Sequence, residues 1–171
     1  MFTRHLLSLL LLAALATGCG NSDPTTTTTE PAIPTSAVPE GLIVSAIDGE
    51  AVTPTAAKTS AKAGDQIVLS GHIAGRAKPF VDGRAIFTLV DTKLPVCTDG
   101  CGTPWDLCCE ETDDIAAAAA TVQVVDGDGN PLKQSLEGPL KPGQVITVTG
   151  KVKQNDGGTF IVNAEQIAVT K

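Results

Sequence analysis

Aromatic residues and positive charge are scarce in this chain. Its 171 residues include no tyrosine, one tryptophan and four phenylalanines, and the excess of acidic over basic side chains gives a net charge of −7. Proteins that bind single-stranded nucleic acid stack the bases on exposed rings, and phosphate contacts need lysine and arginine. The composition therefore predicts that nucleic acid is not a partner.

Histidine is scarce as well. His72 is the only histidine beyond the first five residues, so a serine or cysteine nucleophile would depend on it as its general base. Ser70 lies two residues away on the same face of an expected strand, too far for a positioned hydrogen bond, and there is no GxSxG motif. A lone strand histidine is more typical of a polar surface than of a metal site. We therefore expect a non-catalytic protein.

The beginning of the chain carries an export signal. Arg4 and His5 precede an apolar run at 6–16. This run is about half as long as the roughly 20 residues that a membrane-spanning helix needs, and a polar tract follows it. We expect the run to be a leader rather than a permanent span.

The end of that run resembles a known processing motif. Residues 15–19, Leu-Ala-Thr-Gly-Cys, resemble the lipobox of bacterial lipoproteins, although Ala16 stands where that family prefers leucine. The resemblance implies that residues 1–18 are a signal peptide and that Cys19 is acylated on its sulfur. The alternative is an ordinary secreted protein, cut at Ala16 or Gly18, with Cys19 unmodified.

A lipid on Cys19 would anchor the mature protein in the cell envelope. Each buried methylene contributes about 0.8 kcal/mol, so two or three acyl chains hold firmly. Gly20, rather than aspartate, follows the cysteine, and the sorting habit of the family then favours the outer membrane, at its periplasmic or surface face, over the inner membrane. Residues 19–40 contain a threonine run and four prolines, a composition typical of a disordered tether.

The rest of the chain, residues 41–171, has the pattern of one all-β domain. Short apolar runs are separated by glycine, proline and aspartate. The alternation is clearest near the C-terminus, where Ile146, Val148 and Val152 fall on one face of a strand and polar residues on the other. Strands are expected at 42–47, 67–73, 85–91, 121–126, 145–152 and 159–169.

Internal glycines and the last turn favour a small barrel. Gly71 and Gly150 lie inside apolar runs, where glycine often marks a bulge or a tight bend. Residues 155–158, Asn-Asp-Gly-Gly, suit a hairpin between the last two strands. Over residues 62–171 the pattern resembles an OB-fold, which implies a five-stranded Greek-key barrel. The helix usual between its third and fourth strands has room for one turn at best at 131–142, and a β-sandwich is the alternative.

Two further segments have a local interpretation. Residues 116–120 are all alanine and could form a short helix, with Asp113 and Asp114 as candidate N-caps. Residues 126–130, Asp-Gly-Asp-Gly-Asn, have the spacing of a calcium loop, but Pro131 stands where that loop needs glycine. We interpret this second segment as a turn.

Four cysteines are concentrated in an insertion, at about 95–114, between the second and third barrel strands. They are Cys97, Cys101, Cys108 and Cys109. In the oxidising compartment that export implies, such cysteines usually pair as disulfides. Adjacent cysteines rarely bond to each other, so Cys108 and Cys109 would each form a disulfide with Cys97 or Cys101. Two connectivities are therefore open. Trp105 is expected either to cover the sulfurs or to contact the barrel.

The alternative for these cysteines is a metal site, because four thiolates at short spacing can hold zinc or copper. The spacing counts against it, since structural zinc sites usually present two separated pairs, whereas CxxxC followed by CC crowds the ligands. A thiol-exchange pair is disfavoured because the chain has no CxxC motif and no positive charge nearby.

These observations predict a membrane-anchored, extracytoplasmic module that binds or scaffolds without catalysis. OB-fold loops bind oligonucleotides or oligosaccharides. Since the acidity disfavours the former, a protein or a glycan is the expected partner, alongside the membrane held through the lipid. No cofactor is expected. The alternative function is metal binding or redox handling by the four cysteines of the insertion.

Overall fold

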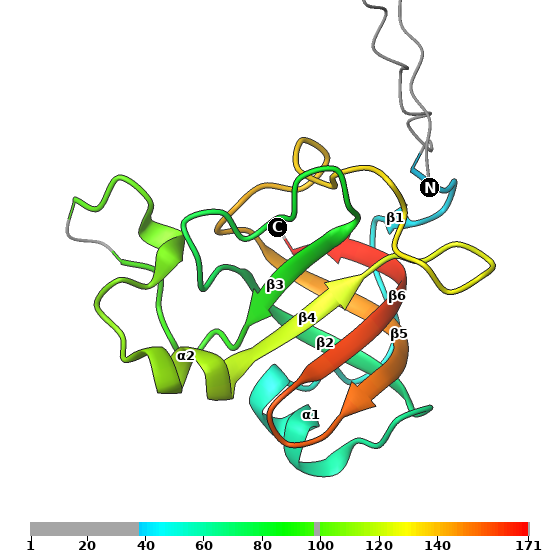
Figure 1. The fold of residues 1–171 in the computed structure, drawn as a ribbon, viewed down its shortest axis with the longest axis horizontal. Coiled ribbons are helices and arrows are strands. Elements are labelled where there is room, and N and C mark those ends of the chain that lie inside the picture. Colours follow the sequence, from blue (N-terminus) through cyan, green and yellow to red (C-terminus); the bar gives the residue numbers. More distant parts are fainter. Residues whose placement is uncertain (1–37, 98–99, 171) are drawn as a thin grey trace, which may run out of the picture. The chain divides into compact units, whose positions relative to one another are not determined.

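The computed structural model describes residues 38–97 and 100–170 (Figure 1). The expected signal peptide, Cys19 and most of the expected tether lie outside the described residues. Across the described ranges, no helix has both the length and the apolar character needed to cross a bilayer. The elements are β1 (Ile43–Val44), α1 (Pro54–Ser60), β2 (Gln66–Ile73), β3 (Ile86–Val90), the 3-10 helix η1 (Pro104–Asp106), α2 (Thr112–Ala118), β4 (Ala119–Gln123), β5 (Val145–Asn155) and β6 (Phe160–Val169).

Five of the strands close into a barrel. β2 pairs with β3, β3 with β4, β4 with β6, β6 with β5, and β5 returns to β2. All of these pairings are antiparallel except that of β4 with β6. The expected OB-like Greek-key barrel is therefore confirmed, and the sandwich alternative is excluded because the sheet closes on itself. The short β1 adds to β6 in parallel outside the ring.

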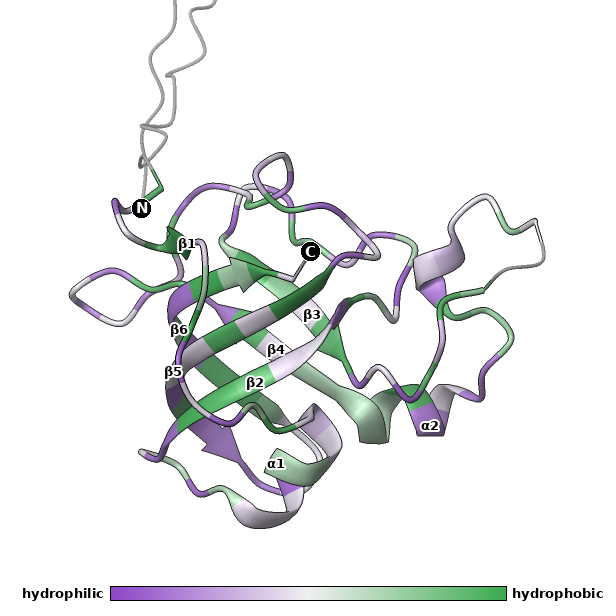
Figure 2. Cartoon of the chain, turned by 180° about the vertical axis from the view of Figure 1, so that it is seen from behind, coloured by the Kyte–Doolittle hydropathy of each residue, from purple (hydrophilic) through white to green (hydrophobic). Residues whose placement is uncertain are grey.

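The barrel closes because each strand turns one apolar face inward. In β5, Ile146, Val148 and Val152 are buried, whereas Thr147, Thr149 and Lys151 are exposed or half-buried, as the alternation predicts. Bands of apolar and polar residues alternate along the strands in Figure 2. Leu69 and Phe87 fill the same interior from β2 and β3, and burying a side chain of this size stabilises the fold by about 1.5–3 kcal/mol.

Gly71 and Gly150 mark places where two backbones approach closely. A Cβ on Gly150 would clash with the carbonyl oxygen of Asn163, and a Cβ on Gly71 would clash with that of Val90. The pairing of β5 with β6 also shifts register between Thr149 and Gly150. The bulge or bend expected from these glycines is thus present at Gly150.

Helix α1 was not expected from the sequence. Its N-cap is Thr53, whose hydroxyl accepts a hydrogen bond from the amide of Ala56 at 3.3 Å, and Pro54 stands at the first helical position. Threonine followed by proline is a start signal for a helix. Ala57 is fully buried in the barrel core, so the helix adds to the same hydrophobic cluster as the strands.

The short helix expected at 116–120 exists, but it lies earlier, as α2 at Thr112–Ala118. Its N-cap is Glu111, which makes no side-chain cap hydrogen bond, so the assignment of Asp113 and Asp114 as N-caps is wrong. They occupy the first turn, where acidic side chains interact favourably with the helix dipole. The next residue, Ala119, already belongs to β4, because it pairs with Val90 of β3.

The turns follow the sequence closely. The Asp126 carboxylate accepts hydrogen bonds from the amides of Asp128 and Asn130, at 3.0 and 2.9 Å, so residues 126–130 form a turn as expected. The segment 131–142 contains no helix, also as expected. Gly157, at φ +85°, lies in the predicted hairpin between β5 and β6.

Candidate metal site in the cysteine insertion

The chain between β3 and β4 forms an insertion on the outside of the barrel. In both views it projects from the side of the barrel away from β1 (Figures 1 and 2). The insertion has a hydrophobic cluster of its own, separate from the barrel core. Its buried members are Ala74, Val90, Leu107 and Ala118, and Leu94, Val96, Trp105, Ile115 and Ala119 pack against them.

Trp105 fastens the insertion to the barrel. Its indole nitrogen donates a hydrogen bond to the carbonyl oxygen of Ala77 at 3.0 Å, and its own carbonyl oxygen accepts one from the amide of Gly75 at 2.8 Å. Both partners belong to the loop that follows β2. Of the two roles expected for Trp105, the contact to the barrel is the one observed.

The chain reverses direction at Leu107, which brings the last two cysteines toward the first two. Leu107 is the only non-glycine residue with positive φ in the described ranges, at φ 60° and ψ 38°, a conformation that costs a non-glycine residue of order 1–3 kcal/mol. Its side chain is completely buried in the cluster of the insertion. Burial of the leucine side chain offsets the backbone strain and holds the turn.

Hydrogen bonds on either side of this turn fix the cysteine backbone. The Asp106 carboxylate accepts from the hydroxyl of Thr103 at 2.7 Å and from the amide of Cys108 at 3.0 Å. The amide of Cys97 donates to the carbonyl oxygen of Pro104 at 2.9 Å. Cys97, which is far from Cys108 along the chain, is thereby brought beside it.

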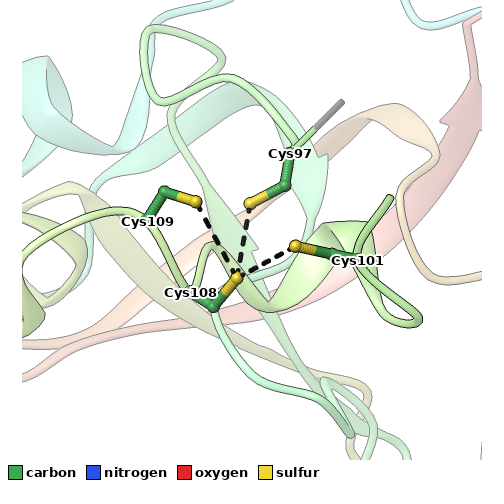
Figure 3. Close-up of side chains that lie close together, drawn as sticks. All are labelled: Cys97, Cys101, Cys108 and Cys109. Atoms are coloured by element: carbon green, nitrogen blue, oxygen red, sulfur yellow. Dashed lines mark hydrogen bonds between the residues drawn. The ribbon is translucent and has the colours of Figure 1, made fainter. Parts of the chain in front are cut away.

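The four sulfurs converge on one point (Figure 3). Cys108 Sγ lies 3.2 Å from Cys101 Sγ, 3.8 Å from Cys97 Sγ and 3.9 Å from Cys109 Sγ, and all four sulfurs lie within 4.8 Å of one another. A disulfide needs an S–S distance of about 2.05 Å. The two expected disulfides are therefore not formed between the described cysteines, because the chain gathers the thiols into one cluster rather than two pairs.

These distances suit a tetrahedral thiolate site. With a zinc–sulfur bond of about 2.3 Å, tetrahedral geometry places the sulfurs about 3.8 Å apart. The reversal at Leu107 turns Cys108 and Cys109 toward the other two cysteines, and the crowding inferred from CxxxC followed by CC is confined to the 3.2 Å pair of Cys101 and Cys108. Cys97 and Cys101 are half-buried, whereas Cys108 and Cys109 are exposed, so an ion held here would be reachable from solvent.

Contacts among the sulfurs shift the pKa values of three thiols. A hydrogen bond from the amide of Cys109 lowers the pKa of Cys97, with desolvation opposing it. Hydrogen bonding to Cys101 and Cys97 raises the pKa of Cys108 to about 12. Hydrogen bonding to Cys97 and Cys108 raises the pKa of Cys109 to about 11. Binding of a metal to such thiols releases their protons.

Two buried polar groups lie at the base of the insertion, where β3 ends. His72, expected on the surface, is only 4% exposed, and Asp91 is fully buried. Within the described part of the chain, neither His72 Nε2 nor Asp91 Oδ2 has a hydrogen-bond partner. Burial lowers the pKa of His72, partly opposed by the charge of Asp91. Burial raises the pKa of Asp91, but hydrogen bonding from the Lys93 amide and from nearby threonine hydroxyls brings it below its ordinary value.

No family model, curated protein or solved structure matches the chain. The fold and the site alone define its class, which is a closed five-stranded β-barrel of OB-like topology with a four-thiol insertion between the second and third barrel strands.

Proposed function

We propose that this protein is an exported, lipid-anchored, non-catalytic binding module whose ligand is a thiophilic metal ion. The ion is held by Cys97, Cys101, Cys108 and Cys109. The observation that carries the proposal is the convergence of four Sγ atoms within 4.8 Å of one another. The proposal makes a metal the ligand of the module, in place of the protein or glycan expected from the sequence.

The donor set selects the class of ion. Thiolates prefer zinc or copper(I), whereas magnesium and calcium prefer oxygen ligands. The exposure of Cys108 and Cys109 supports an exchangeable ion rather than a buried structural one. Zinc is the first candidate, because the separations of Cys108 from Cys97 and Cys109, 3.8 and 3.9 Å, match the edges of a tetrahedral zinc site. The Cys101–Cys108 separation, 3.2 Å, is shorter than such an edge and would have to lengthen around the ion.

The anchor and the metal site are assigned to separate parts of the chain. The insertion lies on the side of the barrel away from β1 (Figure 1). The leader and the lipobox-like residues 15–19 are the sequence features that support export and anchoring.

Zinc titration of the reduced full chain in detergent tests the proposal. We expect one equivalent of zinc by elemental analysis and by intact mass under native conditions. Cys108→Ser should remove stoichiometric binding, because it deletes the sulfur that contacts the other three. Cys19→Ser is the matched control, since it removes a cysteine outside the cluster and should retain the full equivalent.

The mass of the wild-type chain isolated from membranes also reports whether Cys19 carries acyl chains. A reduced chain that takes up neither zinc nor copper(I) would refute the metal-binding function. An unacylated chain that is freely dissolved and retains its leader would refute the anchor.

A further inference from the structure

We infer that the four-cysteine site is controlled by oxidation, which joins Cys101 to Cys108 and Cys97 to Cys109 and releases the metal. This inference rests on the proposed metal-binding function and adds its regulation. It also chooses between the two disulfide connectivities that the sequence leaves open.

The sulfur geometry selects the pairing. Cys101 and Cys108 form the closest pair, at 3.2 Å, whereas Cys97 and Cys108 are 3.8 Å apart. The backbone amide of Cys109 donates a hydrogen bond to the Cys97 sulfur. Pairing Cys108 with Cys101 therefore starts from the shortest sulfur separation, and it leaves Cys97 as the partner of Cys109. The vicinal pair Cys108 and Cys109 is 3.9 Å apart, and its closure would strain the intervening peptide.

The pattern of exposure favours attack on both pairs. Each selected pair joins one half-buried cysteine, Cys101 or Cys97, to one exposed cysteine, Cys108 or Cys109. Cysteines that bind a metal do so as thiolates, so with zinc bound the exposed sulfur of each pair would be a thiolate that an oxidant in solution can reach. The half-buried partner then resolves the oxidised sulfur in the next step.

The chemistry balances with hydrogen peroxide as the oxidant. For each pair, one thiolate attacks a peroxide oxygen, the O–O bond breaks and a sulfenic acid forms. The second thiolate then attacks the sulfenic sulfur, and hydroxide leaves. Two pairs consume two peroxide molecules, give two disulfides and four hydroxide ions, and leave the divalent ion with no thiolate ligand, so it dissociates.

The scaffold around the cluster tolerates this change. Closing the pair of Cys101 and Cys108 from 3.2 Å to about 2.05 Å requires a movement of about 1 Å, and the anchoring bond from Trp105 to Ala77 lies outside the cluster. The oxidised insertion therefore remains docked on the barrel, and oxidation acts on the metal rather than on the fold.

The test uses the full chain with Cys19→Ser, so that the insertion thiols are the only ones. The reduced chain is loaded with zinc without oxygen and titrated with hydrogen peroxide, with zinc release followed by a coloured chelator. We expect complete release at two equivalents of peroxide, with a mass change equal to the loss of four hydrogens and no added oxygen.

Pair variants on the same background test the connectivity. Cys97→Ser with Cys109→Ser keeps the close pair Cys101 and Cys108, whereas Cys97→Ser with Cys108→Ser keeps Cys101 and Cys109. We expect the first variant to form its disulfide about tenfold faster than the second, because its sulfurs are already placed for reaction. Equal or reversed rates would overturn the pairing.

The outcomes separate this inference from the function on which it rests. A chain that binds zinc but keeps it after oxidation, or that loses it only on conversion to sulfinic or sulfonic acids, refutes the redox control and leaves metal binding in place. A reduced chain that binds no zinc refutes both.

Discussion

Asp106 holds Cys108 by its backbone, with Asp106 Oδ1 accepting a hydrogen bond from the Cys108 amide at 3.0 Å. The other carboxylate oxygen accepts from the hydroxyl of Thr103 at 2.7 Å. Asp106 thus spans the 3-10 helix and the reversal that follows it. Asp106 would therefore orient the proposed ligand Cys108 without touching the metal itself. Groups that hydrogen-bond to ligands play this part in established metal sites.

Asp106→Ala is expected to weaken zinc binding by about 10–100-fold, the usual cost of losing a group that orients a ligand. The reason is that Cys108 loses the bond that fixes its backbone. The zinc affinity is measured by competition with a chelator of known affinity. Asp126→Ala is the matched control, since Asp126 likewise accepts two hydrogen bonds, both from backbone amides, but lies in a distant turn. The zinc affinity of this variant should not change. Equal losses in both variants would contradict the orienting role.

Trp105→Phe is expected to loosen the insertion. The variant keeps an aromatic ring but leaves the Ala77 carbonyl without its donor, which should cost about 1 kcal/mol. The free energy of unfolding is measured by urea denaturation followed by circular dichroism, since the variant has no tryptophan. Hydrogen exchange at the Gly75 amide, which donates to the carbonyl of Trp105, should become faster. Unchanged exchange at Gly75 would show that the indole does not hold the loop.

The barrel could be predicted because its signals are local and repeated. Alternating apolar residues at Ile146, Val148 and Val152 fix one face of β5, and Gly150 marks the close approach to β6. Helix α1 escaped prediction because it is only seven residues long, too short for a helical period to stand out. Its start signal, Thr53 followed by Pro54, was present and is the feature that could have revealed it.

The candidate site could be predicted in its composition but not in its geometry. All four cysteines stand out in the sequence, yet their convergence depends on the left-handed conformation of Leu107. Leucine does not favour that conformation, and only the buried cluster under the insertion stabilises it. No local sequence pattern predicts a tertiary contact of this kind. The sequence therefore favours disulfides, on the grounds of the compartment and the cysteine spacing. The burial of His72 escaped prediction for the same reason, since it depends on contacts that are distant in the sequence.

Gly150→Ala is expected to destabilise the barrel by about 1–3 kcal/mol, the usual cost of overpacking. The added methyl would clash with the backbone carbonyl of Asn163, which cannot move without breaking the pairing of β5 with β6. Gly127→Ala is the matched control, because a Cβ there meets nothing within 4 Å and its φ is not positive. Thermal and urea unfolding are measured for both variants. A stable Gly150→Ala protein would contradict the close approach of the two strands.

His72 is expected to make the protein less stable in mild acid. Its pKa is lowered in the folded state by burial, so between that value and the ordinary value of about 6.5 the unfolded chain binds more protons. Stability therefore falls as the pH drops below about 6.5, with a slope of at most about 1.4 kcal/mol per pH unit for one proton. Asp91, whose pKa is also lowered, adds a further loss only below its ordinary pKa of about 3.9.

The measurement is the free energy of unfolding from urea titrations between pH 8 and pH 5, on reduced protein with a chelator present, so that metal release does not contribute. His72→Gln should remove most of the slope in this window, because no other histidine lies within the described residues and Asp91 stays ionised there. Glutamine can also donate a hydrogen bond from this buried position, so the variant is expected to fold. A slope that persists in His72→Gln would assign the acid sensitivity to another group and contradict the burial of a neutral imidazole at the base of the insertion.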